Sequence, residues 1–357
     1  MLAAAGTMAL SACGSDSQGG STTNAGNSSP TAAANCATGD LKGAGSTFQK
    51  NIVAQWIKDF GAACSGANID YQPVGSGAGI TQFGANTIDF AGSDSVMKPD
   101  EQSAADKRCG SPAIHLPITA GGIALIYKLG DVKNLQLSPT TIAGIFQGTV
   151  KKWDDPAIKA DNPGASLPGT GITPVHRSDS SGTTSVFSKF LNATAASDWK
   201  LGEGKELKWP ASVQGAKGSD GVTQAVAGSD GAITYAEVSY ATSSGLGVAK
   251  VKNGAGEYAA LDAASVGKAL EGASVPDSGD LKVKYDFANK TSGAYPITAL
   301  SYEIVCSKGN DAGKLALLKA FLTYDVTAGQ AAAEGLGFAP LPPSIADKVK
   351  TAVDGLA

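Results

Sequence analysis

Short apolar runs typical of strands alternate with amphipathic segments typical of helices along most of this 357-residue chain, and this alternation constrains the fold most. β-Branched and aromatic residues cluster in the expected strands, which are 69–72, 123–127, 172–175, 231–235 and 302–306. Apolar residues recur with helical periodicity in the expected helices, which are 48–60, 183–191, 314–324 and a last one from Ser344. The alternation predicts an α/β fold with mostly parallel sheets.

The N-terminal residues predict a leader and a lipid anchor. Residues 1–12 are small and apolar, and Leu10-Ser11-Ala12-Cys13 is similar to the lipobox of bacterial lipoproteins, although no basic segment precedes it. The alternative is an incidental cysteine. Residues 14–35 contain almost no large apolar side chain and are typical of a flexible tether. We therefore expect residues 1–13 to be a signal remnant with lipobox, lipidation at Cys13, and a domain held at the outer face of the cell membrane.

Five cysteines are an odd number for an exported protein. If Cys13 carries lipid, four remain for two disulfides in an oxidising compartment, namely Cys36, Cys64, Cys109 and Cys306. The alternative is four free, buried thiols. The spacings contain no CxxC pattern and the chain has only two histidines, so the sequence does not favour a metal site.

The charge balance argues against nucleic acid as a ligand. Charged residues make up 17% of the chain, its formal net charge is −4, and Lys and Arg form no cluster. An anion bound by this chain must therefore be held by local dipoles and one or two cations.

Three Gly-, Ser- and Thr-rich segments lead into expected helices. They are Gly43–Phe48, Gly75–Gly79 and Arg177–Thr183. Helix starts present unpaired N–H groups and partial positive charge, glycine permits close approach, and hydroxyls add donors, so such segments suit an anion. Each segment alone is more typical of an ordinary helix N-cap than of an anion site. None matches a Walker A loop or the dinucleotide fingerprint.

Five motifs together resemble one known family over nearly all of residues 40–345. GAGSTF, YQPVGSGAGI, ANTIDFAGSDS, KKWDDPAI and HRSDSSGTT occur in the order and approximate spacing of periplasmic phosphate-binding proteins, the PstS-type component of ABC phosphate transporters. The resemblance implies a two-lobed, type II-like binding-protein fold, with a mixed sheet flanked by helices in each lobe. Lobe one would comprise 36–117 and 297–357, and lobe two 118–296. The similar sequences LPIT (116–119) and YPIT (295–298) would lie near the two connections, and the alternative is that these four-residue sequences are similar by chance.

The resemblance also implies a ligand set for phosphate, without metal or cofactor. The implied ligands are Thr47, Phe48 through its backbone N–H, Ser76, Asp94, Arg177, Ser181, Gly182 through its backbone N–H, and Thr183. Asp179 is similar to the family aspartate that restrains the arginine. The sequence departs from the family where Gly77 replaces a common serine, and where His176 replaces a common arginine.

The chemistry of these residues fits phosphate. Arg177 can donate a bidentate, charge-assisted pair of hydrogen bonds. Asp94 accepts only when ionised, so it can take a hydrogen bond from a protonated phosphate oxygen, whereas sulfate has no proton to offer. A site that leaves such a buried polar pair unmatched rejects the analogue strongly.

Further expectations follow from this resemblance. In the implied architecture all four remaining cysteines fall in lobe one, and the pairing we expect is Cys36–Cys64 and Cys109–Cys306, each joining neighbouring element ends. The partners would be phosphate and an ABC permease, with the membrane contacted by the lipid alone and the protein a monomer. The alternatives are binding of another oxyanion or small phosphorylated solute, a surface antigen without phosphate binding, and a hydrolase built on Ser181, His176 and Asp179.

Overall fold

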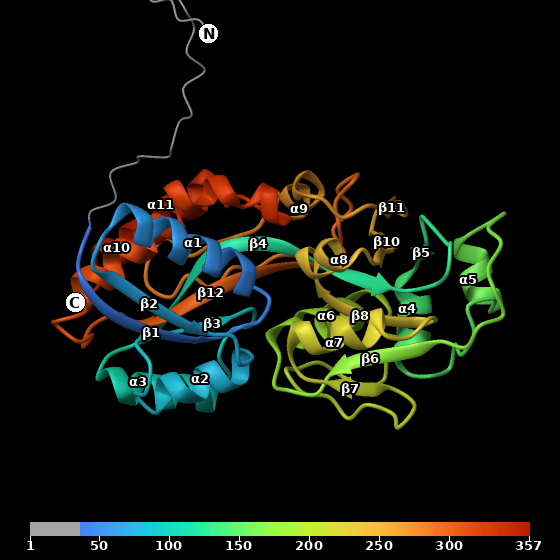
Figure 1. The fold of residues 1–357 in the computed structure, drawn as a ribbon, viewed down its shortest axis with the longest axis horizontal. Coiled ribbons are helices and arrows are strands. Elements are labelled where there is room, and N and C mark those ends of the chain that lie inside the picture. The colour runs from blue at the N-terminus through green and yellow to red at the C-terminus, as the bar shows by residue number, and fades with distance from the viewer. Residues whose placement is uncertain (1–35) are drawn as a thin grey trace, which may run out of the picture. The chain divides into compact units, whose positions relative to one another are not determined.

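The structure is a computed structural model, and it describes residues 36–357 (Figure 1). The expected lipobox with Cys13 and the expected tether 14–35 lie outside these residues. Within the described part of the chain, no helix combines the length and apolar character that crossing a membrane requires.

One ten-stranded sheet organises the described chain. Its main path runs through β2 (Ala67–Gln72), β1 (Gly39–Gly45), β3 (Phe90–Ser93), β12 (Thr298–Cys306), β4 (Ala113–Tyr127), β8 (Ala232–Glu237), β6 (Thr173–Arg177) and β7 (Gln214–Ala216). The short strands β9 (Gly247–Val248) and β13 (Phe338–Ala339) also pair with β4. A separate three-stranded sheet contains β11 (Tyr258–Ala259), β10 (Lys250–Lys252) and β5 (Gln136–Leu137).

The long strand β4 connects the two halves of the sheet. Its 15 residues are all buried, and they pair with β12 from Ala113 to Gly122 and with β8 from Ile123 to Tyr127. Figure 1 shows β4 running from the half that holds β1–β3 to the half that holds β6–β8. The structure is therefore the two-lobed α/β architecture that the resemblance implied, with β4 shared by both lobes.

Eleven α-helices and two 3₁₀ turns belong to residues 36–357. They are α1 (Lys50–Ala63), α2 (Ser76–Gly84), α3 (Pro99–Cys109), α4 (Pro139–Phe146), α5 (Pro156–Asp161), α6 (Gly182–Thr194), α7 (Gly218–Ala227), α8 (Val238–Ser244), α9 (Ala263–Ala269), α10 (Leu315–Asp325), α11 (Pro343–Asp354), η1 (Ala328–Ala332) and η2 (Glu334–Leu336). In Figure 1, α1, α10 and α11 lie on one side of the first half of the sheet, and α2 and α3 lie on the other. Both faces of that half are therefore covered.

The predicted apolar face of α1 forms part of the core. Ile52, Val53, Trp56 and Phe60 are fully buried, as the helical period over 48–60 predicts. Each large side chain buried in this way contributes about 2–3 kcal/mol. The indole N–H of Trp56 donates to the carbonyl oxygen of Gly329 at 2.7 Å, so its one polar atom is also satisfied.

The expectation of mostly parallel sheets is wrong. β1 pairs parallel with β2 and β3, and β6 pairs parallel with β7 and β8, but β12 pairs antiparallel with both β3 and β4. The local βαβ pattern predicts the parallel pairs correctly. It cannot predict that a strand almost 200 residues further along the chain inserts between β3 and β4. The sheets are mixed, as the resemblance implied.

Two disulfides connect element ends in the half that holds β1–β3. Cys36, which precedes β1, is joined to Cys64, which follows α1, with 5.2 Å between the Cα atoms. Cys109 at the end of α3 is joined to Cys306 at the end of β12, with 5.4 Å between the Cα atoms. These are the two pairs that we expected.

We predict that the two disulfides differ in their contribution to stability. The Cys109→Ala/Cys306→Ala variant should lose about 5 kcal/mol of unfolding free energy and the Cys36→Ala/Cys64→Ala variant about 3.5 kcal/mol, because chain entropy in the unfolded state depends on loop length. The sequence separations are 197 and 28 residues. Urea denaturation of both variants without reductant measures the difference. Equal losses, or the reverse order, would contradict the loop-length argument.

Candidate functional site

The structure brings all eight expected ligand residues into one buried region. They lie just before α1, at the start of α2, after β3, at the end of β6 and at the start of α6. Each is buried: Thr47, Phe48, Ser76, Asp94, Arg177, Ser181, Gly182 and Thr183. Residues from both halves of the sheet contribute, so the region lies where the two lobes meet.

The loop before α1 turns sharply at Gly45. This residue has a φ of 147°, and a Cβ here would lie 2.1 Å from the carbonyl oxygen of Gly92, so only glycine fits beside β3. The chain then presents Ser46 and Thr47 to the site before α1 begins at Lys50. The backbone N–H of Phe48 donates to Ser46 Oγ at 3.0 Å.

Asp94 accepts hydrogen bonds from three separate segments. Its Oδ1 accepts from Ser46 Oγ at 2.5 Å and from Ser301 Oγ at 2.8 Å. Its Oδ2 accepts from Thr183 Oγ1 at 3.1 Å. Burial raises the pKa of Asp94, and these three hydrogen bonds and the charge of Arg177 only partly oppose that rise. The ionisation of the Asp94 carboxyl group therefore depends on the hydrogen bonds that it accepts.

Arg177 at the end of β6 is paired with Asp179. Its Nε donates to Asp179 Oδ1 at 2.7 Å and its Nη2 to Asp179 Oδ2 at 2.5 Å. Burial alone would raise the pKa of Asp179, but the hydrogen bonds and charge of Arg177, with the N–H of Gly218, hold that pKa below its usual value. Because Asp179 occupies the Nε edge, a ligand must use the Nη1–Nη2 end of the guanidinium.

The start of α6 approaches the opposite half very closely. Ser181 caps the helix by accepting the N–H of Thr184 at 3.1 Å, and Gly182 is the first helical residue. A Cβ on Gly182 would lie 2.5 Å from Ser76 Oγ and 2.8 Å from the backbone nitrogen of Asp94. Glycine is required here because the first turns of α2 and α6 almost touch.

The departure from the family at Gly77 has a local explanation. Its N–H donates to the carbonyl oxygen of Ser180 at 2.9 Å. A Cβ on Gly77 would lie 2.2 Å from Ser180 Oγ and 2.4 Å from Ser180 Cβ. A serine at position 77 would therefore collide with Ser180 in this arrangement.

Three serines that contact the expected ligands were not in the expected ligand set, although Ser46 belongs to the predicted segment Gly43–Phe48. Ser46 and Ser301 donate to Asp94, as described above, and Ser219 Oγ lies 2.8 Å from Thr47 Oγ1 and 3.4 Å from Arg177 Nη1. Gly218-Ser219 opens α7 with the same Gly-Ser pattern as two of the three predicted segments, Gly43–Phe48 and Gly75–Gly79, so this start was recognisable. Ser301 is one polar residue in a buried strand, and nothing in the sequence indicates its partner.

His176 faces away from the candidate ligands. Its ring stacks on Trp209 with 4.8 Å between centroids, and its Nδ1 lies 2.8 Å from its neighbour's carbonyl oxygen. Burial lowers the pKa of His176, which favours the neutral ring. The hydroxyl of Ser181 accepts the helix-capping bond and makes none with His176. The geometry therefore provides no nucleophile–base pair for the hydrolase alternative.

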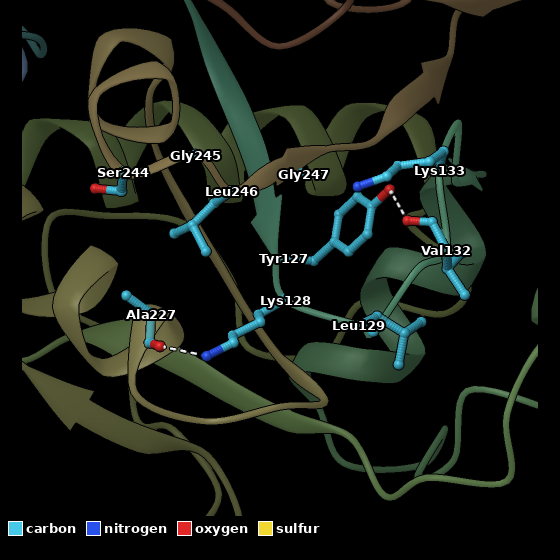
Figure 2. Close-up of a pocket in the computed structure, with 11 residues that line it drawn as sticks. Tyr127, Lys128, Leu129, Val132, Lys133, Ala227, Ser244, Gly245, Leu246 and Gly247 are labelled. Carbon is cyan, nitrogen blue, oxygen red and sulfur yellow. Dashed lines mark hydrogen bonds between the residues drawn. The ribbon is translucent and has the colours of Figure 1, made fainter.

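One surface pocket reaches the candidate site, and another is lined by none of the candidate ligand residues. One of about 230 Å³ reaches Asp94 and is lined also by Lys189, Lys284 and Tyr285. The other, of about 260 Å³, lies beside Tyr127 and Lys128 at the end of β4 (Figure 2). In that second pocket, Lys128 Nζ donates to the carbonyl oxygen of Ala227 and the Tyr127 hydroxyl to that of Val132, so both polar groups are already bonded.

Metal ligation has no geometric support in the described residues. Between residues 36 and 357, no group of three or more His, Cys, Asp or Glu side chains is arranged to hold an ion. The polar groups of the site are instead an arginine, a carboxyl, hydroxyls and backbone N–H groups, which together suit a small, protonated oxyanion.

The two-lobed fold with a buried polar site between the lobes defines a solute-binding protein, and the model of the PBP superfamily domain matches residues 30–328. The phosphate-binding protein PstS 3 of Mycobacterium tuberculosis is 40% identical, with 99% of this chain and 96% of the relative covered. The phosphate-binding protein PstS of Xylella fastidiosa is 35% identical, with 87% and 84% covered. A high-affinity periplasmic phosphate-binding protein (PfluDING) solved with phosphate is 25% identical, with a TM-score of 0.72 over 88% of this chain and 93% of that chain. The chain belongs to the PstS family of phosphate-binding proteins.

We predict that Gly77→Ser lowers stability through its collision with Ser180. Overpacking of this kind costs about 1–3 kcal/mol. Urea denaturation should show that loss in Gly77→Ser and its recovery in Gly77→Ser/Ser180→Gly. Gly61→Ser is the matched control, because a Cβ on Gly61 meets nothing within 4 Å. If Gly77→Ser is as stable as Gly61→Ser, the close approach is not a constraint.

Proposed function

We propose that this protein binds inorganic phosphate outside the cytoplasmic membrane and delivers it to an ABC permease for import. One observation carries the proposal: a buried carboxyl, Asp94, and a buried arginine, Arg177, belong to one polar site at the meeting of two lobes. The relatives named as phosphate-binding proteins support the same ligand.

The proposed ligand set combines one full charge with many neutral dipoles. Arg177 donates through the end of its guanidinium that Asp179 leaves free. Hydroxyls and backbone N–H groups at the starts of α1, α2 and α6 supply the other donors, which are Thr47, Phe48, Ser76, Ser181, Gly182 and Thr183. Helix starts favour an anion through their unpaired N–H groups and partial positive charge. The net charge of −4 thus does not prevent anion binding.

Asp94 is the proposed selectivity residue. Its Oδ2 has one hydroxyl donor, Thr183, so a further lone pair is available to a protonated phosphate oxygen. Sulfate would place an unprotonated oxygen against this carboxylate, and the repulsion would be strong in a buried site. Asp179 has the separate role of holding the arginine in place.

Lobe closure is the proposed capture step. Gly77 and Gly182 bring α2 and α6 into near contact, which excludes water from a ligand between them. The lobes are proposed to comprise 36–117 with 297–357, and 118–296, joined near 116–122 and 293–300. Separation of these bodies would admit phosphate, and their approach would bury it.

We further propose that the protein is a lipid-anchored monomer outside the cell membrane. Lipidation at Cys13 would tether it to the outer face of the membrane as a monomer, with residues 14–35 as the spacer. The permease would receive phosphate from the closed form. No catalytic step is proposed, because the site has no activated nucleophile.

A small phosphorylated solute is the second candidate ligand. The pocket of about 230 Å³ beside Asp94 has room for a small substituent and is lined by Lys189 and Lys284. Calorimetric titration of phosphate-stripped protein with phosphate, methyl phosphate, sulfate and arsenate separates the candidates. Tight binding of phosphate and arsenate but not of methyl phosphate is expected. Preference for the monoester would favour the second candidate.

We predict that Asp94→Asn reduces discrimination against sulfate. The ratio of phosphate to sulfate affinity should fall by at least about 100-fold, because the amide removes the repulsion and can donate to a sulfate oxygen. Calorimetry with both anions measures the ratio, and Asp161→Asn, a buried carboxyl elsewhere, is the control. An unchanged ratio would remove Asp94 from this role.

We also predict that Arg177→Ala weakens phosphate binding by about 10²- to 10³-fold, because it removes the only full positive charge proposed in the site and leaves the partly buried Asp179 without its partner. Calorimetry again gives the affinity. Lys189→Ala serves as the control, since this lysine lines the neighbouring pocket without belonging to the proposed ligand set. Near wild-type affinity in Arg177→Ala would refute the assignment.

A further inference from the structure

A chain of buried polar side chains leads from Asp94 into the interior of the protein. Ser301 Oγ lies 2.8 Å from Asp94 Oδ1 and 2.5 Å from Gln49 Oε1. The amide of Gln49 is hydrogen-bonded in turn to the carboxyl of Glu303. Gln49, Ser301 and Glu303 are all fully buried. Nothing in the proposed ligand set explains why the interior holds this chain.

This chain of hydrogen bonds has one hydrogen too few if every one of these short contacts is a hydrogen bond. Ser301 has a single hydroxyl hydrogen and two acceptors, Asp94 and Gln49. The oxygen and nitrogen of a glutamine amide exchange places on a half-turn, and the hydrogen-bond network decides between them. The direction of the whole chain therefore depends on whether Glu303 carries a proton.

When Asp94 is ionised, as acceptance of a phosphate proton requires, two arrangements of these hydrogen bonds are possible. If Glu303 is a carboxylic acid, it donates to the Gln49 oxygen, the Gln49 nitrogen donates to Ser301, and the Ser301 hydrogen points to Asp94. If Glu303 is ionised, the Gln49 nitrogen must donate to it, Ser301 donates to Gln49, and Asp94 loses a donor. Only the first arrangement gives Asp94 both of its Oδ1 donors, Ser46 and Ser301.

The surroundings of Glu303 favour the acid form. The groups that face it are Asp94 after β3, Asp325 from α10 and Tyr71 from β2, and no cationic side chain of residues 36–357 is paired with it. Its Oε2 and both carboxyl oxygens of Asp325 are buried without a protein partner. Burial first, and then the charge of Asp94, raise the pKa of Glu303 well above its usual value.

The strand β3, which neighbours β12, leaves space for this chain of hydrogen-bonded side chains. Gly92 on β3 is the register partner of Glu303 on β12. A Cβ on Gly92 would lie 2.4 Å from the Gln49 amide nitrogen and 2.2 Å from the Tyr71 hydroxyl. Any larger residue at position 92 would displace the amide that connects Glu303 to Ser301.

We propose that Glu303, held as a carboxylic acid, is a positioning residue for ligand recognition, which acts through Gln49 and Ser301 to direct a hydroxyl hydrogen at Asp94. This inference rests on the proposed function. A hydrogen bond donated to the ionised carboxyl favours that form, and Asp94 must be ionised to accept the proton of a phosphate oxygen. Glu303 thereby extends the pH range over which Asp94 can recognise its ligand toward acid.

The experiment measures phosphate affinity by calorimetry at pH 5 and pH 8. The variants are Ser301→Ala, Glu303→Leu, their double variant, Gln49→Leu and Glu303→Gln. Each affinity is divided by that of wild type at the same pH, so that the titration of phosphate itself cancels. We expect Ser301→Ala, Glu303→Leu and Gln49→Leu each to lower phosphate affinity about tenfold at pH 5 and less than threefold at pH 8. The lost donor matters most at the lower pH, where protonation of Asp94 competes with ligand recognition.

Two comparisons separate positioning from a merely structural role. The double variant should lose no more affinity than Ser301→Ala alone, because both changes remove the same hydrogen bond. Glu303→Gln should recover most of the affinity that Glu303→Leu loses at pH 5, since its amide can donate to Gln49 as the acid does. Asp161→Leu, a buried carboxyl outside the chain, should show no pH-selective loss.

The outcomes distinguish the inference from the proposed function. Wild type that fails to bind phosphate refutes the proposed function, and the inference with it. If wild type binds phosphate, the inference alone is refuted by either of two results. The affinity losses of Glu303→Leu and Ser301→Ala are additive, or each loss is equal at pH 5 and pH 8. If Glu303→Leu does not fold, Gln49→Leu and Ser301→Ala give the same test, and a loss that is independent of pH in both overturns it.

Discussion

The buried carboxyl of Asp94 imposes the strongest constraint on this structure. A carboxylate taken out of water must be supplied with donors, and those of Asp94 come from the loop before α1, from β12 and from α6. These segments are separated by between 48 and 207 positions from Asp94 in the sequence. To supply this one side chain with hydrogen-bond donors, β12 must lie beside β3, and α6 must pack against the half of the sheet that holds β1–β3. The strand β4, which belongs to both halves, permits this arrangement.

The electrostatics of the site are local. The chain as a whole is acidic, and the buried guanidinium of Arg177 is already largely balanced by Asp179. In the proposed ligand set, neutral donors at helix starts supply the remaining attraction for the anion, and their number matters more than the charge of the protein surface. The fourth such start, at Gly218-Ser219 of α7, contacts Thr47 and Arg177 and so connects the two groups of donors.

The sequence predicts local structure well and long-range pairing poorly. The helical period over 48–60 corresponds to α1, and the apolar runs at 172–175 and 302–306 fall in β6 and β12, because periodicity reports which face is buried. The antiparallel insertion of β12 is not encoded locally, so the prediction of mostly parallel strand pairing was wrong. Motif resemblance identified the segments that meet around Asp94. It could not identify Ser301, whose role depends on a partner 207 positions away.

The glycines of the site have a different physical reason from the one that the sequence first suggests. A Gly-rich segment before a helix predicts a backbone that approaches a ligand, yet Gly77 and Gly182 are required because two parts of the protein approach each other. The two reasons are linked, since a small anion can be enclosed only if the lobes come nearly into contact around it. At Gly77 the volume that a serine would need is occupied by Ser180 of the opposite half. Pairs of residues such as these set the distance between the two halves of the site. A larger side chain at position 77 must therefore be matched by a smaller one at position 180.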